Sequence, residues 1–313
     1  MNTKDTRKGP TLSTGIRIGI DLGGTKIEAV ALDAGGNERS KLRVTTPRDY
    51  RGTVRAIVGL VEATEEACGP AAEPIGVGIP GTISPTTGLV KNANSTWLIG
   101  HPFDRDLAEA LGRPVRMMND ANCFALSEAT DGAGAGAGVV FGVILGTGVG
   151  GGLVIDGTVV EGAQGIGGEW GHNPLPWPED DERPGPECYC GQRGCIETFL
   201  SGPGMVRDHA TVTGEELTTH EIAERCAAWD EAAVATMARY VGRLARGLAT
   251  VIHVVDPDVV VLGGGMSNLP GLAEGVSAAL RAWVFSDEVA TRVASNVHGD
   301  SGGVRGAAWL GGG

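Results

Sequence analysis

Apolar and polar positions along the chain predict a repeated strand–turn–strand unit. Apolar residues run through residues 16–22 and 27–32, and a turn at Gly23 and Gly24 separates the two runs. The same order of apolar run, glycine turn and apolar run returns over residues 139–156. Each segment is typical of a β-hairpin. Their repetition near the start of each half predicts a duplicated domain.

Helical periodicity and further apolar runs lie between and after the two hairpins. The predicted helices are residues 51–68, 103–111, 119–129 and 230–253, one that begins at about Pro270, and residues 302–310. The further predicted strands are residues 74–80, 115–118 and 258–262. Strands that alternate with helices in this way are typical of an α/β fold.

Length and composition support two soluble domains. A chain of 313 residues is too long for one ordinary core, and its 42% hydrophobic and 20% charged residues are typical of a globular protein. Glycine is the unusual feature, with 52 residues gathered beside apolar runs. Glycine at such places permits a positive φ or a close approach of the backbone to a ligand.

Charge and the N-terminal sequence argue against a nucleic-acid-binding, secreted or membrane protein. A net charge of −13 argues against nucleic acid as a partner, because phosphate contacts need a basic face. Residues 1–15 lack the apolar core of a signal peptide and are predicted to be a disordered leader. No apolar run is long enough to span a bilayer, so no membrane partner is expected. A cytoplasmic enzyme is the resulting prediction.

The glycine turns are candidate phosphate-binding sites. Residues 146–151 fit the dinucleotide pattern G-x-G-x-x-G, but a predicted strand follows them where that motif requires a helix. No P-loop pattern occurs in the sequence. The two Gly/Thr turns, at Gly23 and at Gly146, instead offer backbone N–H groups and a hydroxyl to phosphate oxygens. Tight turns without a ligand are the alternative.

The segment CYCGQRGCIE, residues 188–197, holds three of the six cysteines. With His172 sixteen residues earlier, it offers the three sulfurs and one imidazole of a closed zinc site. A reduced structural cluster and a redox pair are the alternatives, because Cys-x-Cys departs from the usual zinc spacing. The acidic, proline-rich residues 176–187 are predicted to form an exposed loop.

Several carboxylates are candidates for chemistry, each with an ordinary alternative. Asp120 lies at a predicted strand–helix junction, where the local pattern alone favours a helix N-cap. Glu169 and Glu197 are suitable acceptors for sugar hydroxyl groups, but single glutamates are usually solvated charges. His172 by itself is more often a satisfied core residue. Asp21 is otherwise a hairpin-turn carboxylate.

Six motifs together resemble the ROK family of bacterial sugar kinases and repressors. In chain order they are DLGGTK from Asp21, Asn119-Asp120, LGTG from Leu145, GEWGH from Gly168, CYCGQRGCIE from Cys188, and LGGG from Leu262. The resemblance extends over about residues 16–310. It implies the sugar kinase/actin/heat-shock ATPase fold, an α/β architecture of two ribonuclease-H-like domains with an interdomain cleft.

The resemblance also implies roles for individual residues. It places the catalytic base on Asp120, and the sugar contacts on Asn119, Glu169, His172 and Glu197, with Gly81 and Asn94 as weaker candidates. It places ATP on Asp21, Gly23, Gly24, Thr25, Lys26, Gly146, Thr147, Gly148, Gly264, Gly265 and Met266. Its zinc ligands match His172, Cys188, Cys190 and Cys195. Mg²⁺ is implied by ATP chemistry, with Asp21 near the metal-bound phosphates.

Substrate and domain organisation follow from the same resemblance. Residues 91–98 and 168–177 look most like the fructokinase (mannofructokinase) branch, which implies transfer of the ATP γ-phosphate to the 6-hydroxyl of D-fructose, with mannose as a further substrate. A glucokinase or N-acetylhexosamine kinase is the alternative, and a non-catalytic sugar-responsive regulator is the alternative from another class. Few residues precede Asp21, which argues against a DNA-binding module. The expected small domain is residues 16–118 plus 299–313, the large domain is residues 119–298, and a homodimer is expected.

Overall fold

The structure, a computed structural model, describes residues 15–72 and 74–311, which form two compact units. Unit 1 holds the described residues up to Cys123, residues 163–165 and the residues from Gly303 onward; unit 2 holds the others. The first boundary therefore falls inside helix α3 (Asp120–Asp131). Apart from Gly15, the predicted disordered leader lies outside the described residues.

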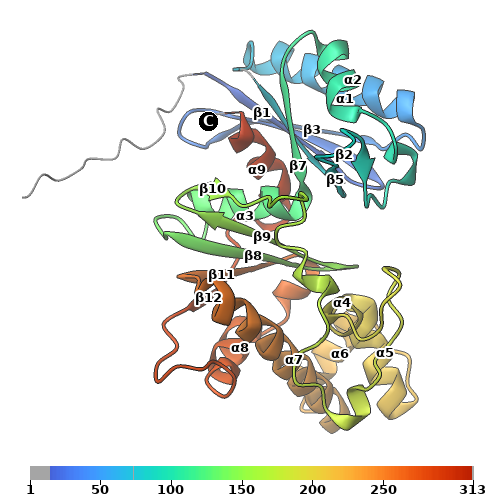
Figure 1. The fold of residues 1–313 in the computed structure, drawn as a ribbon, viewed down its shortest axis with the longest axis vertical. Helices are drawn as coiled ribbons and strands as arrows, with labels where there is room; N and C mark the ends of the chain where they lie inside the picture. Colours follow the sequence, from blue (N-terminus) through green and yellow to red (C-terminus); the bar gives the residue numbers. More distant parts are fainter. Residues whose placement is uncertain (1–14, 73, 312–313) are drawn as a thin grey trace, which may run out of the picture. The chain divides into compact units, whose positions relative to one another are not determined.

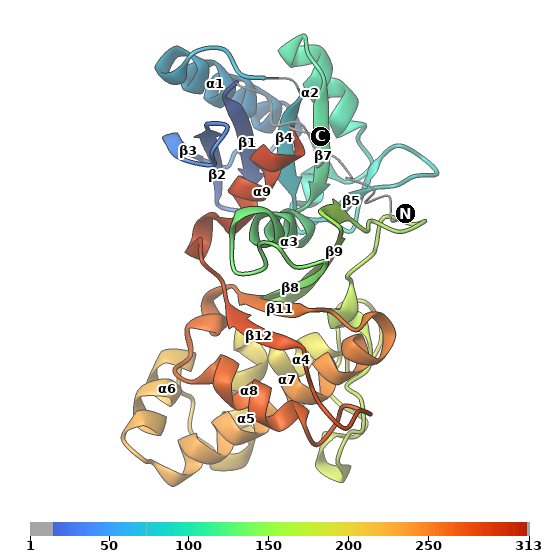
Figure 2. The same cartoon turned by 90° about the vertical axis from the view of Figure 1, so that its left-hand side faces the viewer.

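Unit 1 contains a five-stranded mixed sheet (Figure 1) with the order β3-β2-β1-β4-β7, and all five strands are labelled in Figure 2. The strands are β1 (Arg17–Leu22), β2 (Lys26–Leu32), β3 (Glu38–Thr45), β4 (Ile75–Ile79) and β7 (Val115–Asn119). β1, β2 and β3 pair in antiparallel fashion, whereas β4 lies parallel to both β1 and β7. The hairpin predicted over residues 16–32 is thus present. A two-stranded ribbon, β5 (Thr82–Ile83) with β6 (Val90–Lys91), follows β4.

Unit 2 repeats this topology in a second five-stranded sheet with the order β10-β9-β8-β11-β12. The strands are β8 (Val139–Leu145), β9 (Val149–Ile155), β10 (Thr158–Val159), β11 (Val259–Gly263) and β12 (Arg292–Ser295). Again the first three strands are antiparallel and the last two parallel. The duplication predicted from the two hairpins is therefore confirmed at the level of the sheets.

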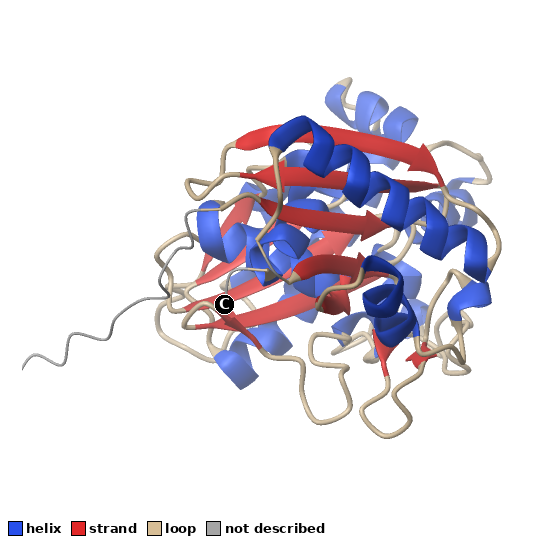
Figure 3. Ribbon diagram, turned by 90° about the horizontal axis from the view of Figure 1, so that it is seen from above, coloured by secondary structure: helices blue, strands red, loops and turns tan. Residues whose placement is uncertain are grey.

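Helices cover both faces of each sheet, as the helix and strand colours of Figure 3 show. In unit 1, α1 (Tyr50–Cys68) and α2 (Phe103–Leu111) pack on one face, and α9 (Gly302–Leu310) packs on the other (Figure 2). In unit 2, one face receives the part of α3 from Phe124 onward. The other face is covered by α4 (Ile196–Leu200), α5 (Gly202–Thr213), α6 (Thr219–Ala227), α7 (Glu231–Val255) and α8 (Leu272–Leu280) (Figure 2). Among the described residues, no helix is long and apolar enough to cross a membrane.

Some of the abundant glycines serve packing in place of ligand binding. A Cβ atom on Gly19 of β1 would lie 2.2 Å from the Val304 carbonyl oxygen, and one on Gly76 of β4 would lie 1.7 Å from that of Ala307. Both distances are too short for real contacts, so only glycine lets helix α9 lie so close to the sheet. This packing role was not predicted from the sequence, where the glycines were assigned to ligand loops and turns.

A buried arginine in β1 gives a first prediction for stability. The Arg17 side chain is 1% exposed, and its three guanidinium nitrogens have no hydrogen-bond partner among the described residues. The guanidinium does lie over the Trp309 ring, with Cζ 4.9 Å from the ring centroid, and this cation–π contact offsets part of the cost of burying the charge. Burial lowers the pKa of Arg17. Because a desolvated, unpaired charge is costly, Arg17→Met is expected to raise the free energy of unfolding by about 1 kcal/mol.

Urea denaturation of the intact chain measures this effect. Arg113 is the matched control, because its guanidinium is paired with Glu65 at 2.6 Å and with the Ala71 carbonyl at 2.8 Å. Arg113→Met should therefore lower the urea midpoint. A midpoint for Arg17→Met that falls as far as that of the control would contradict the account.

Candidate active site

Strand β1 carries a buried carboxyl group, Asp21, just before the exposed turn that joins β1 to β2. Asp21 lies opposite Glu28 in the β1–β2 register and beside Gly78 of β4. Burial, followed by the charges of Asp120 and Glu28, raises the pKa of Asp21 to about 7. Gly24 and Thr25 at the tip of the turn are exposed. A half-neutral carboxyl close to a second one is a place where a divalent cation would be bound favourably.

The remaining residues of this turn form the hydrogen bonds of a β-hairpin, as predicted. The Gly23 amide donates to the Lys26 carbonyl at 3.0 Å, and the Thr46 hydroxyl donates to the Gly23 carbonyl at 2.8 Å. The Lys26 ammonium lies 3.4 Å from the buried Glu28 carboxylate. Glu28 also pairs with Lys41 and Arg43. This paired, buried carboxylate was not identified in the sequence.

Asn119 and Asp120 share the N-terminus of α3 but differ in role. The Asn119 side chain accepts hydrogen bonds from the amides of Ala121 at 2.9 Å and Asn122 at 3.4 Å. It is therefore Asn119 that supplies the helix cap which the local pattern favoured for Asp120. Asp120 is the first residue of the helix, where the partial positive charge of the helix N-terminus stabilises an ionised carboxylate.

Gly81 lies directly beside this helix start. Its carbonyl accepts a hydrogen bond from the Asn119 amide group at 3.3 Å, and its φ of 98° is a conformation that favours glycine. A Cβ atom there would lie 2.5 Å from the Lys91 carbonyl oxygen. Asn94, three residues after Lys91, is exposed. The structure thus brings Gly81, Asn119 and Asp120 together in unit 1, with Asn94 in the segment next to Gly81.

In unit 2, the second glycine turn lines a pocket of about 1050 Å³. The turn joins β8 to antiparallel β9, so the dinucleotide reading of its glycines is excluded by the strand that follows. Of the residues predicted to bind ATP, the pocket is lined by Gly146, Thr147, Gly265 and Met266. Gly264 has a φ of 80°, and a Cβ atom on it would lie 2.4 Å from the Leu145 carbonyl oxygen.

The pocket also has a wall that the sequence analysis missed. This wall is formed by Gly202, Pro203, Val206, Arg207 and Ala210 of α5 and by Glu216, Leu217, Thr218 and Thr219. A signal for it was present, because Ser201-Gly-Pro reads as a helix start with a serine cap and an early proline. The Ser201 hydroxyl indeed accepts a hydrogen bond from the Gly204 amide at 3.2 Å.

The candidate sugar carboxylate Glu197 is bound to the same glycine turn. It lies in the first turn of α4, and its carboxylate accepts a hydrogen bond from the Val149 amide at 2.9 Å. A Cβ atom on Gly148 would lie 2.7 Å from the Glu197 carboxylate oxygen, so any larger residue would disturb it. Glu169 lies immediately before the 3₁₀ turn η2 (Trp170–His172), and its carbonyl accepts from the His172 amide at 3.3 Å.

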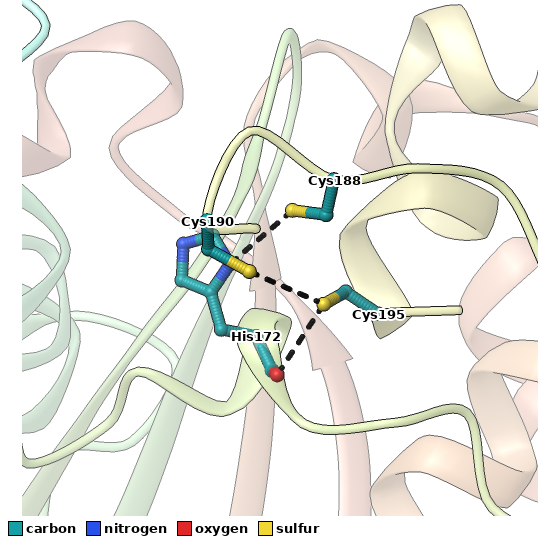
Figure 4. Close-up of side chains that lie close together, drawn as sticks. All are labelled: His172, Cys188, Cys190 and Cys195. Atoms are coloured by element: carbon teal, nitrogen blue, oxygen red, sulfur yellow. Dashed lines mark hydrogen bonds between the residues drawn. The ribbon is translucent and has the colours of Figure 1, made fainter. Parts of the chain in front are cut away.

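His172, Cys188, Cys190 and Cys195 converge in unit 2 (Figure 4), with their candidate ligand atoms all within 4.8 Å of one another. His172 Nδ1 lies 3.6 Å from Cys188 Sγ, and Cys190 Sγ lies 3.6 Å from Cys195 Sγ. Ligands on a tetrahedral zinc ion with Zn–S bonds of about 2.3 Å are separated by about 3.8 Å. The donor set and its spacing therefore fit zinc. Burial raises the pKa of Cys195 to about 12, which a metal would offset.

Comparison with known proteins identifies the family. Residues 17–312 match the profile of the ROK family. The chain belongs to the ROK family. The N-acetyl-D-glucosamine kinase of Pasteurella multocida is 40% identical over 301 residues, which cover 94% of this chain and 99% of that protein. The corresponding kinase of Mannheimia succiniciproducens is also 40% identical, over 93% of this chain and 98% of its own length.

Solved structures of ROK proteins share the fold. The ROK hexokinase of Thermus thermophilus has a TM-score of 0.84 at 35% identity and covers 95% of this chain and 97% of its own. The ROK glucokinase of Streptomyces griseus, solved with glucose and AMPPNP, has a TM-score of 0.77 at 30% identity and covers 95% and 99%. The predicted sugar kinase/actin-like fold is confirmed. Fructokinase specificity is not confirmed, since the relatives that are named for one sugar are kinases of N-acetyl-D-glucosamine and of glucose.

The loop of residues 176–187, which was expected to be exposed, is mostly exposed, but one of its residues departs from that expectation. Glu182 near its centre is only 7% exposed. Its carboxylate accepts from Arg243 Nε at 2.7 Å and from Arg246 Nη2 at 2.6 Å, both on helix α7. These hydrogen bonds lower the pKa of Glu182 to about 2 against the opposing effect of burial. Glu182 therefore anchors the loop to helix α7, while most of the other loop residues are exposed.

Proposed function

We propose that this ROK protein is an ATP-dependent hexose kinase that transfers the γ-phosphate to the 6-hydroxyl of N-acetyl-D-glucosamine. The observation that carries the choice of sugar is the 40% identity, over 93–94% of the chain, to N-acetyl-D-glucosamine kinases. This is the N-acetylhexosamine alternative of the sequence analysis, and it takes precedence over fructose. Identity maintained over nearly the whole of both chains supports a shared substrate class.

The chemistry is assigned to Asp120. Phosphoryl transfer needs a base that accepts the proton of the attacking hydroxyl, together with aligned reactants and neutralised phosphate charge. Asp120 begins helix α3, where the helix N-terminus favours a negatively charged side chain, and Asn119 beside it fixes the helix start. The arrangement supports Asp120 as the proton acceptor and Asn119 as a sugar contact. Gly81 and Asn94 are assigned to the sugar as well, as weaker candidate contacts.

The nucleotide and its cation are assigned to both glycine turns. The turns of Gly23–Lys26 and of Gly146–Gly148, with Gly264, Gly265 and Met266, offer backbone N–H groups and hydroxyls to phosphate oxygens. Asp21, with Asp120 close by, is the residue proposed to hold Mg²⁺. The bound Mg²⁺ ion would neutralise the negative charge of the ATP phosphates. The raised pKa of Asp21 supports this, because a cation would restore its ionised form.

Zinc is assigned a structural role in the sugar site. His172 would be both a metal ligand and a neighbour of the sugar, and Glu197 follows the ligand Cys195 by two residues. Removing the metal with a chelator is therefore expected to lower the melting temperature and to weaken sugar binding more than nucleotide binding. Calorimetric titration of the metal-free protein with N-acetylglucosamine and with ADP measures both. Unchanged sugar affinity after metal loss would show that the two are not coupled.

The proposed substrate is tested by a panel of sugars. With ATP and Mg²⁺, kcat/KM is measured for N-acetylglucosamine, glucose, mannose and fructose under the same conditions. We expect N-acetylglucosamine to be preferred by about tenfold or more, the scale of discrimination that a few pocket contacts provide. A preference of about tenfold or more for fructose would instead support the fructokinase predicted from the sequence. Sugar binding without any ADP release would favour a non-catalytic regulator.

Three further expectations stay predictions. A homodimer is tested by light scattering at micromolar concentration, and a cytoplasmic location by fractionation of the source cells. The domain limits, residues 16–118 with 299–313 and residues 119–298, are tested by limited proteolysis, which should cut first near those limits.

A further inference from the structure

Tyr189 is an exposed aromatic residue held in a fixed place by the cysteine segment. It lies between the candidate zinc ligands Cys188 and Cys190, and 77% of its surface is exposed. The Cys188 amide donates to the Gln192 carbonyl at 2.9 Å, and the Gly191 amide donates to the Cys188 carbonyl at 3.0 Å. These bonds close a tight turn with Tyr189 at its tip. The turn therefore fixes where the Tyr189 ring is presented to solvent.

The phenol of Tyr189 contacts the nitrogen of His172 that faces away from the cysteines. Its oxygen lies 3.0 Å from His172 Nε2, and the two rings meet edge to face with centroids 5.1 Å apart. The other ring nitrogen, Nδ1, is the one that faces Cys188. With Nδ1 bound to a metal, Nε2 carries the proton and donates it to the phenol oxygen. The phenolic proton is then available to another acceptor.

Both candidate sugar carboxylates belong to the two segments that hold this phenol and His172. The Glu169 carbonyl accepts a hydrogen bond from the His172 amide at 3.3 Å, and Glu197 lies two residues after the candidate ligand Cys195. The phenol O–H group of Tyr189 can serve as a hydrogen-bond donor. Glu169, His172, Glu197 and Tyr189 thus form one polar group of side chains in unit 2, in which the Tyr189 ring supplies an apolar surface.

We propose that Tyr189 is a specificity-determining sugar contact. Its ring packs against the methyl of the substrate's acetamido group, and its hydroxyl, oriented by His172, donates to the acetamide carbonyl oxygen. A glucose molecule offers neither group, so Tyr189 favours the N-acetylated sugar. The inference rests on the proposed function, since it concerns the substrate of that same site.

Affinity measurements on the zinc-loaded protein test this proposal without relying on turnover. Dissociation constants for N-acetylglucosamine and for glucose are measured by calorimetry for the wild type, Tyr189→Phe and Tyr189→Ala, with the zinc content of each determined. Tyr189→Ala is expected to reduce the preference for N-acetylglucosamine by about tenfold or more, and Tyr189→Phe by about three- to tenfold through the lost hydroxyl. Trp229→Ala removes a similarly exposed ring, 85% exposed, and should change neither constant.

The outcomes separate this inference from the proposed function. A preference within about twofold of the wild type in zinc-loaded Tyr189→Ala overturns the role of Tyr189. If Tyr189→Ala loses zinc, Tyr189→Phe decides: a reduced preference supports the proposal and an unchanged one overturns it. A wild-type protein that prefers another sugar would instead refute the proposed function, whatever Tyr189 contributes.

Discussion

Asp120→Asn is expected to lower kcat by about 10²–10⁴-fold while leaving the fold and the sugar affinity nearly unchanged. The amide keeps the size of the carboxylate and its position at the start of α3, but it cannot accept the proton of the sugar hydroxyl. The helix itself should persist, because its cap comes from Asn119. Steady-state kinetics with N-acetylglucosamine and ATP, together with calorimetric sugar binding, measure the two effects separately.

Asp131→Asn is the matched control for this variant. Asp131 is the last residue of the same helix and pairs with His298 at 2.8 Å, away from the helix start. Its amide variant should retain turnover near the wild-type rate. If Asp120→Asn also retained that rate, Asp120 would not be the base, and the proton would have to be accepted elsewhere.

Glu182→Ala is expected to lower the free energy of unfolding by about 3–5 kcal/mol. The substitution leaves Arg243 and Arg246 of α7 without the buried carboxylate that both of them contact. Arg243 keeps Asp208 at 2.7 Å, but among the described residues Arg246 would keep only the Trp177 carbonyl at 2.5 Å and its place over the Trp283 ring. Denaturant unfolding followed by circular dichroism measures the loss.

An exposed ion pair in the same segment gives the comparison. Glu187 pairs with Arg193 at 3.0 Å, and both side chains are more than half exposed. Glu187→Ala should therefore cost less than about 1 kcal/mol, as surface pairs do. Equal losses for the two variants would mean that Glu182 is no more important than a surface charge and that the loop is not anchored through it.

The parts of the fold that the sequence predicts are those with strong periodicity. The two hairpins, α1, α2, α3 and α7 all combine regular apolar spacing with clear glycine or polar boundaries. β3 was missed because it is an edge strand with mostly exposed, charged residues, so no apolar pattern marks it. β12 is a four-residue edge strand, also without a buried residue. Edge strands are specified by their neighbours more than by their own sequence.

Helices α5 and α6 had local signals that the sequence analysis did not use. Thr218 and Glu221 form a capping box before α6, with hydrogen bonds in both directions. α8 was expected at about Pro270 and begins at Leu272, after a short 3₁₀ turn, η4 (Gly265–Asn268). The difference is within the usual uncertainty of helix ends. Recognition of α5 in particular would have pointed to the missing wall of the pocket.

The candidate site could be predicted only where its motifs are local in the sequence. The Cys/His cluster is an example, since three of its members lie within eight residues. Glu182 could not be predicted, because its importance depends on arginines that lie more than sixty residues away along the chain. The roles of Asn119 and Asp120 likewise depended on the hydrogen-bond geometry at the helix start, which two adjacent residues in a sequence do not disclose.

The central claim is that this ROK protein phosphorylates N-acetyl-D-glucosamine. Incubating the purified chain with ATP, Mg²⁺ and N-acetylglucosamine, and identifying the product by phosphorus–proton correlation NMR, tests it most directly. We expect stoichiometric ADP and a sugar monoester with phosphate on the 6-oxygen, and we expect Asp120→Asn to form both products about 10²–10⁴-fold more slowly. ATP consumed without a phosphorylated N-acetylglucosamine, or no ATP consumed at all, would contradict it.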